Sequence, residues 1–181
     1  MRTFVVYVED RTGVLNRVAS LFRRRAYNIH SLTVGETETP GISRMTISVE
    51  SDAGGARRIE ANLYKLPHVI RVEDITCRSS IVRDLVLVKV GADPQTRTQI
   101  MEIVQMFRAR VVDVAPESLV IEMTGTEDKI AGLLDVLRPY PVIEMVRTGR
   151  VAMTRGVGSD TTSVAPTGGF GQEPDGVAYP V

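Results

Sequence analysis

Apolar and polar positions in the first half of the chain follow two periods, which predict a regular succession of strands and helices. The segment "TFVVYV" (3–8) is rich in β-branched and aromatic residues and predicts a buried strand. Apolar residues then recur at helical spacing, at Val14, Val18, Leu21 and Phe22. Further strands are expected at 29–36, 43–50 and 68–76, with a second helix that ends before Pro67. The predicted order is βαββαβ.

The second half of the chain repeats this order. A strand is expected at 84–91, followed by a helix and by a hairpin of the segments 110–116 and 118–125. A second helix is expected to begin at the capping residue Thr126, and a final strand follows at 142–153. Each half therefore predicts a ferredoxin-like unit, in which two helices cover one face of an antiparallel sheet. The other face, or a sheet edge, is left free to pair.

The predicted fold class is α+β, with two tandem ferredoxin-like domains at 1–77 and 83–155 that are joined near residues 78–80. Beyond Arg155 the composition changes, because 156–181 contains six glycines and neither Lys nor Arg. A segment of this kind buries too little apolar surface to offset the entropy lost on ordering. We therefore expect a flexible tail and assign it no function.

Composition and charge narrow the range of functions and locations that we expect for this protein. The 181 residues carry a formal net charge of zero, which disfavours a protein whose main task is to neutralise phosphates. No apolar run is long enough to cross a bilayer, and the first residues meet acidic positions too early for a signal peptide. The single cysteine, Cys77, excludes an internal disulfide framework. We expect a cytoplasmic protein that binds neither nucleic acid nor membrane.

Residues that support catalysis are sparse in this sequence. His30 and His68 lie in predicted strands, far apart, without partners at metal-ligand spacing. Nothing around Cys77 suggests an activated thiolate, and no Walker, G-x-S-x-G or G-x-G-x-x-G motif is present. The sequence therefore predicts a chain without a catalytic or metal site of its own.

RNA binding is an alternative, because ferredoxin-like sheets also occur in RNA-recognition domains. Those domains stack bases on aromatic residues of a central strand, and the segment 43–50 contains no aromatic residue. The run Arg23-Arg24-Arg25 is basic, but its place at a helix end is explained by the helix dipole and by solvation. Both observations disfavour this alternative.

The segment "EDRTGVLNRVASLF" (9–22) places a turn between the first strand and the first helix. Such a turn leaves the amides of Gly13, Val14 and Leu15 unpaired within the helix, and a glycine lets a ligand approach them. A carboxylate docked there would gain about 0.3–1 kcal/mol, and a buried branched side chain about 1.5–3 kcal/mol more. A single domain offers only a shallow surface to a ligand, so we expect the binding pocket to lie between two copies of the domain. The alternative is that Thr12 simply caps the helix.

The segment 7–49 resembles the opening of the small, regulatory subunit of acetolactate synthase, a family of ACT-domain proteins. The resemblance rests on the D-x-x-G-V-L turn that begins at Asp10, and on "YNIHSLTVG" and "SRMTI", which follow in order. The segments "IVRDLVLVKV" and "FRARVVDVAPESLVIEMTGTEDKI" continue it through the second half. The resemblance implies that 1–77 is an ACT domain and that 83–155 is ACT-like.

For function, the resemblance implies a non-catalytic subunit that binds and activates the large catalytic subunit of acetolactate synthase. It also implies feedback inhibition by valine in the biosynthesis of valine, leucine and isoleucine. The large subunit would hold thiamine diphosphate, Mg²⁺ and FAD, and this chain would hold no cofactor. A free-standing amino-acid-binding ACT module that regulates a different enzyme is the remaining alternative.

In this family the effector lies between the ACT domains of a homodimer, which pair their sheet edges into one larger sheet. The resemblance places one side of the site at Asp10, Gly13, Val14 and Leu15, and the other side at Asn28 and Ile29 of the partner copy. Asn28 offers both a donor and an acceptor to an α-amino acid. Some family members carry Asn where this chain has Asp10, whose carboxylate favours the ammonium of a ligand and repels its carboxylate.

Overall fold

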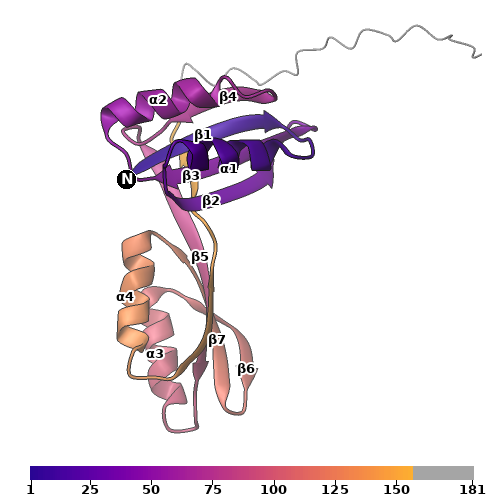
Figure 1. Ribbon diagram of the computed structural model, residues 1–181. Coiled ribbons are helices and arrows are strands. Elements are labelled where there is room, and N and C mark those ends of the chain that lie inside the picture. Colours follow the sequence, from indigo (N-terminus) through magenta and orange to yellow (C-terminus); the bar gives the residue numbers. More distant parts are fainter. Residues whose placement is uncertain (157–181) are drawn as a thin grey trace, which may run out of the picture.

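The structure is a computed structural model that describes residues 1–156, with one antiparallel sheet in each half of the chain (Figure 1). The elements of the first domain are β1 (Arg2–Glu9), α1 (Val14–Arg24), β2 (Ile29–Glu36), β3 (Ile42–Val49), α2 (Ala53–Leu63) and β4 (Val69–Asp74). Its sheet order is β2-β3-β1-β4, as the ferredoxin-like prediction requires. The tail predicted for 156–181 lies outside the described residues, apart from Gly156.

The first core lies between the two helices and one face of the sheet. Phe4, Val6 and Val8 of β1 are buried there, because alternate side chains of a strand point to the same face. Helix α1 contributes the predicted stripe of Val14, Val18, Leu21 and Phe22. This packing fixes the N-terminus of α1 beside the end of β1.

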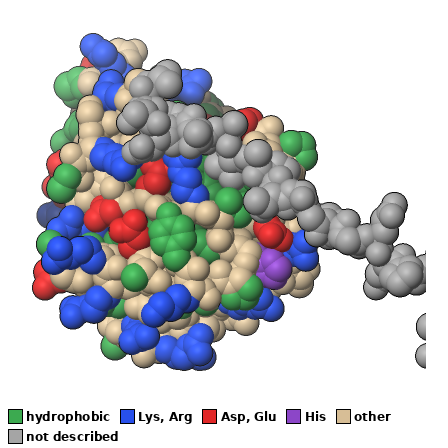
Figure 2. All heavy atoms as spheres, turned by 90° about the horizontal axis from the view of Figure 1, so that it is seen from above, with side chains coloured by type: hydrophobic (Ala, Val, Ile, Leu, Met, Phe, Trp, Pro, Cys, Tyr) green, Lys and Arg blue, Asp and Glu red, His purple; other side chains and the backbone are tan. Residues whose placement is uncertain are grey.

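Basic side chains gather at the opposite end of α1. Arg23 and Arg24 occupy its last turn and are exposed, which is where a positive charge complements the helix dipole. Arg25 donates to the side-chain oxygen of Asn62 on α2 at 3.2 Å. Figure 2 views the first domain from above and shows Lys and Arg side chains along one side of the surface in view.

The second domain repeats the architecture, which confirms the predicted tandem fold. Its elements are β5 (Ser80–Gly91), α3 (Arg97–Phe107), β6 (Arg110–Ala115), β7 (Ser118–Gly125), α4 (Glu127–Leu137), β8 (Val142–Arg147) and β9 (Val151–Thr154). The sheet order is β6-β7-β5-β8, and residues of α3 and α4 complete one core with this sheet. Helix α4 starts after Thr126, but the Thr126 side chain makes no capping hydrogen bond, so that part of the prediction is wrong.

The end of the second domain also differs from the prediction. The single strand expected at 142–153 is divided into β8 and β9 by the segment 148–150. Strand β9 continues in the direction of β8 along β5 and pairs with residues 80–83, so β5 begins four residues earlier than the predicted strand at 84–91. The partner of those four residues comes from the far end of the domain, and local periodicity carries no signal of such a pairing.

The second face of the first sheet is partly covered by the second domain. Val5 and Ile75 are buried with Ala152 of β9, and Tyr7 and Val82 pack against them. Arg44 lies over the Tyr7 ring at 5.9 Å and donates to the carbonyl oxygen of Ala152. This face is therefore not free to pair. Strand β2 lies at one edge of the sheet and pairs only with β3 among the described residues, so its outer edge is open.

Gly149 allows the segment between β8 and β9 to approach β2. A Cβ at this position would lie 2.5 Å from Thr33 Oγ1 and 2.7 Å from the carbonyl oxygen of Leu32. We therefore expect Gly149→Ala to lower the free energy of unfolding by about 1–3 kcal/mol, because the two domains would have to separate locally. Urea unfolding measures this. Gly35→Ala in β2 is the control, since a Cβ on Gly35 meets nothing within 4 Å, and an equal loss in both variants would contradict the prediction.

Candidate functional site

The predicted turn connects β1 to α1 at one end of the first sheet and is held by a defined set of bonds. Asp10 donates its backbone N–H to the carbonyl oxygen of Gly41 at 2.8 Å, which ties the turn to the start of β3. The Glu9 carboxylate contacts Arg11 Nε at 2.7 Å and His68 Nδ1 at 3.0 Å. The turn is therefore anchored to the loops before β3 and β4, and the start of α1 has a fixed position.

Gly13, and not Thr12, is the N-cap of α1. Its φ of 85° lies in the left-handed region, which glycine adopts without the Cβ strain of other residues. No side chain caps this helix, so the alternative in which Thr12 is the cap is wrong. A Cβ on Gly13 would meet nothing within 4 Å, which means that the backbone here lies open at the surface.

The backbone amides at the start of α1 are only partly satisfied. Val14 has no acceptor within the helix, as predicted, but its amide donates to the carbonyl oxygen of Arg11 in the preceding turn at 3.3 Å. Within residues 1–156, the amides of Gly13, Leu15 and Asn16 have no acceptor. The first turn of α1 contains no acidic residue, so its positive dipole end is not neutralised by the helix itself. The arrangement favours an anionic group from outside.

Asn28 and Ile29 lie at the other end of the same sheet. Ile29 pairs with Val49 at the end of β3, whereas Glu9, next to Asp10, pairs with Ile42 at its start. The eight residues of β3 separate the two ends by about 23 Å. One chain therefore does not bring the two predicted halves of the site together. Asn28 is exposed and Ile29 is half-buried.

Two exposed apolar side chains lie at the end of the domain where α1 begins. Leu15, in the first turn of α1, has 43% of its surface exposed, although its neighbour Val14 is buried. Val34, near the end of β2, is 42% exposed on the sheet face that the helices cover, since it pairs with the buried Met45. The sequence analysis did not select Val34, because its exposure depends on the edge position of β2.

The contact between Glu9 and His68 was also not predicted from the sequence. His68 was expected inside a strand, but it lies in the turn before β4 with a φ of 70° and contacts the Glu9 side chain. The only sequence signal was the acidic pair at positions 9 and 10, which does not reveal a partner 59 residues away. These two residues brace the turn and make no contact that marks them as ligands.

The remaining polar residues that the structure describes do not form a metal site. Among the described residues no group of three or more His, Cys, Asp or Glu side chains is placed to hold a metal ion. Cys77 is exposed in the turn between β4 and β5. None of the four helices of residues 1–156 has the length and apolar character needed to span a membrane.

The first domain has the fold of the ACT class, and comparison with known proteins agrees. Residues 4–71 match a family model described as the acetohydroxyacid synthase (AHAS) small subunit-like ACT domain. Residues 83–156 match a second model, the small subunit of acetolactate synthase. Both domains thus point to one family.

Relatives of nearly the same length support this assignment. The chain is 50% identical to the probable acetolactate synthase small subunit of Archaeoglobus fulgidus, over 85% of this chain and 96% of the relative. It is 43% identical to the small subunit of Bacillus subtilis, over 90% and 95%. The crystal structure of the small subunit from Thermotoga maritima is similar with a TM-score of 0.81 and 37% identity, over 86% and 98%. The chain belongs to the acetolactate synthase small-subunit family.

Proposed function

We propose that the chain is the non-catalytic regulatory subunit of acetolactate synthase, which binds the large catalytic subunit, raises its activity and transmits inhibition by valine. The observation that carries the proposal is the open group of unpaired amides at Gly13, in a domain whose relatives are named acetolactate synthase small subunits. The reaction's thiamine diphosphate, Mg²⁺ and FAD would reside in the catalytic partner. Both chains would act in the cytoplasm, in the biosynthesis of valine, leucine and isoleucine.

The proposed effector site needs a homodimer. If two copies pair their β2 strands antiparallel about the middle of the strand, Ile29 of the partner copy lies beside residues 35–36. This brings Asn28 of the partner copy to the end of the sheet where Gly13 lies. The open edge of β2 and the distance between Asn28 and Gly13 in one chain both support this pairing.

Each part of valine has a partner of matching chemistry in this arrangement. Its carboxylate would accept hydrogen bonds from the amides of Gly13 and Leu15, and its ammonium would face Asp10 and Asn28 of the partner copy. Its isopropyl group would pack against Leu15 and Val34, whose exposed surfaces are otherwise in water. Asp10 would then lie on the ammonium side of the ligand, because its carboxylate would repel the ligand's carboxylate.

Inhibition by valine follows only if valine binds more tightly to the inhibited state of the complex than to the active one. By the same reciprocity, binding of the catalytic subunit in its active state must weaken valine binding. Valine and the catalytic subunit would both shift the equilibrium between the two states of the homodimer, because valine binds at the interface between its two copies.

The experiment is to measure acetolactate synthesis by the purified catalytic subunit alone, with this chain, and with this chain and valine. We expect the two chains to co-elute, the chain to raise the rate, and valine to remove most of that rise. Leucine and isoleucine in place of valine define the selectivity. Valine binding without co-elution or stimulation would favour the free-standing ACT module, and the absence of valine binding, stimulation and co-elution would reject both.

A further inference from the structure

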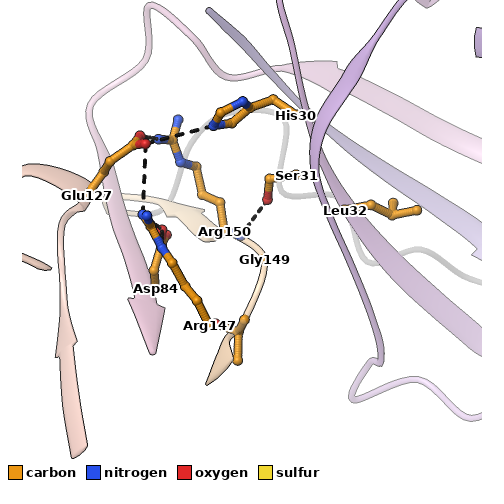
Figure 3. A pocket seen from close by; sticks show the side chains of 9 residues that line it. His30, Ser31, Leu32, Asp84, Glu127, Arg147, Gly149 and Arg150 are labelled. Carbon is orange, nitrogen blue, oxygen red and sulfur yellow. Dashed lines mark hydrogen bonds and ion pairs between the residues drawn. The ribbon is translucent and has the colours of Figure 1, made fainter. Parts of the chain in front are cut away.

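A cleft between the two domains, separate from the α1 turn, is lined by residues of both (Figure 3). Residues 30–32 of β2 form the wall on the first domain. Asp84 of β5, Glu127 of α4, and Arg147 and Arg150 of the β8–β9 segment form the wall on the second domain. The cavity has a volume of about 330 Å³, which is in the range of small-molecule sites.

Asp84 has one carboxylate oxygen without a partner. Its side chain is only 6% exposed, and its Oδ2 accepts hydrogen bonds from Arg147, one of them from Nε at 3.1 Å. Its Oδ1 is buried and has no partner among the described residues. A buried carboxylate oxygen without a donor costs free energy, because it has lost its water without gaining a hydrogen bond. Asp84 lines the cleft, so a molecule bound there can supply the missing donor.

The other charges of the cleft are arranged as opposed pairs. Glu127 Oε2 accepts from Arg150 at 2.7 Å, and its Oε1 lies 3.8 Å from His30 Nε2 and 3.9 Å from Arg147 Nη2. In Figure 3 the carboxylates of Asp84 and Glu127 and the two guanidinium groups point toward one another. The backbone N–H of Arg150 donates to Ser31 Oγ at 2.7 Å, which closes the cleft against β2.

This charge pattern selects a class of ligand. A phosphate would meet two carboxylates, and a metal ion would meet two guanidinium groups, so each would be opposed by half of the lining. A molecule with one ammonium and one carboxylate satisfies both halves. The ammonium supplies the donor that Asp84 Oδ1 lacks, and the carboxylate accepts from N–H groups of Arg147 and Arg150 that the two acids do not use.

We propose that this interdomain cleft is a second binding site, which takes a small zwitterionic α-amino acid. Leu32 is the only apolar side chain among the described residues of the lining, so the site favours a ligand with a small or polar side chain over a branched apolar one. Because residues of both domains line the cleft, the ligand would stabilise their contact and raise the temperature of unfolding. The cleft is distinct from the valine site proposed above, although its residues 30–32 belong to the strand that would pair in the homodimer.

The test uses the full chain with Gly13→Asp, which disables the α1 turn, and records amide chemical shifts by NMR. The probes are L-alanine, propionate, which lacks the ammonium, and ethylamine, which lacks the carboxylate. We expect saturable shifts with L-alanine around residues 30–31, 84, 127 and 147–150, and binding of either half-probe at least about tenfold weaker. Equal binding of all three probes, or no saturable shift, would overturn the proposal.

Two substitutions decide whether Asp84 binds the ligand or only supports the fold. Asp84→Asn keeps the size of the side chain but removes the charge that attracts the ammonium, so L-alanine binding should weaken at least about tenfold. Asp128→Asn makes the same chemical change on the exposed side of α4 and should leave binding unchanged. If Asp84→Asn does not fold, Glu127→Gln is measured instead, with weaker binding expected because the ammonium of the ligand loses the second carboxylate of the cleft. A folded variant of either kind with unchanged L-alanine affinity would refute the site.

Discussion

Replacing Gly13 with aspartate is expected to remove the valine response of the reconstituted enzyme. The new carboxylate would lie beside the amides of Gly13, Leu15 and Asn16, where it would accept their hydrogen bonds itself and repel the carboxylate of valine. We expect the valine concentration for half-maximal inhibition to rise by at least about tenfold, which corresponds to about 1.4 kcal/mol of lost binding free energy. Acetolactate synthesis over a valine titration measures the shift.

Two variants separate the effect of charge from that of backbone strain. Gly13→Asn has the same size and the same left-handed backbone as Gly13→Asp, but no charge, so its shift should be smaller. Gly156→Asp places the same charge at another open glycine with a φ of 71°, away from α1, and should leave the valine response unchanged. Stimulation without valine, recorded in the same assay, reports whether each variant still assembles. A Gly13→Asp complex that assembles and keeps its normal response would contradict the proposed site.

The fold was largely predictable because both domains are built from local amphipathic patterns. Val14, Val18, Leu21 and Phe22 are all buried, as their helical spacing predicted. In β3, Met45, Ile47 and Val49 face the first core, as alternation along a strand requires. Thr46 and Ser48 are also buried, because the second domain covers part of the face that was expected to be free to pair. Patterns read along one strand do not show what packs on it from elsewhere in the chain.

The candidate site was predictable only in part, for the same reason. The D-x-x-G-V-L motif located the turn and the start of α1, which depend on neighbouring residues. The bonds that fix the turn, from Glu9 to His68 and from Asp10 to Gly41, join residues far apart in sequence and leave no periodic signal. The cleft around Asp84 was missed entirely, because β2, β5, α4 and the segment between β8 and β9 meet there only after both domains have folded.

Mixing two variants that each lack valine binding should restore it, if the site is shared between two copies. A homodimer of Gly13→Asp has lost one side of both sites, and a homodimer of Asn28→Ala has lost the other side. In a heterodimer of the two variants, one site carries both substitutions and the other carries neither. We therefore expect no valine bound to either homodimer and one valine per heterodimer, purified through two different tags and measured by isothermal titration calorimetry.

The matched control carries the same two substitutions in one chain. When the double variant Gly13→Asp, Asn28→Ala is paired with the unmodified chain, each shared site contains one substitution, so this heterodimer should bind no valine. A site formed within a single chain predicts the reverse result in both heterodimers, none in the first and one in the second. Because Gly13 and Asn28 lie at opposite ends of β3 in one chain, the shared arrangement is the one that the fold favours. One valine bound to the control heterodimer would show that the site lies within one chain, and would reject the proposed site at the interface between two copies.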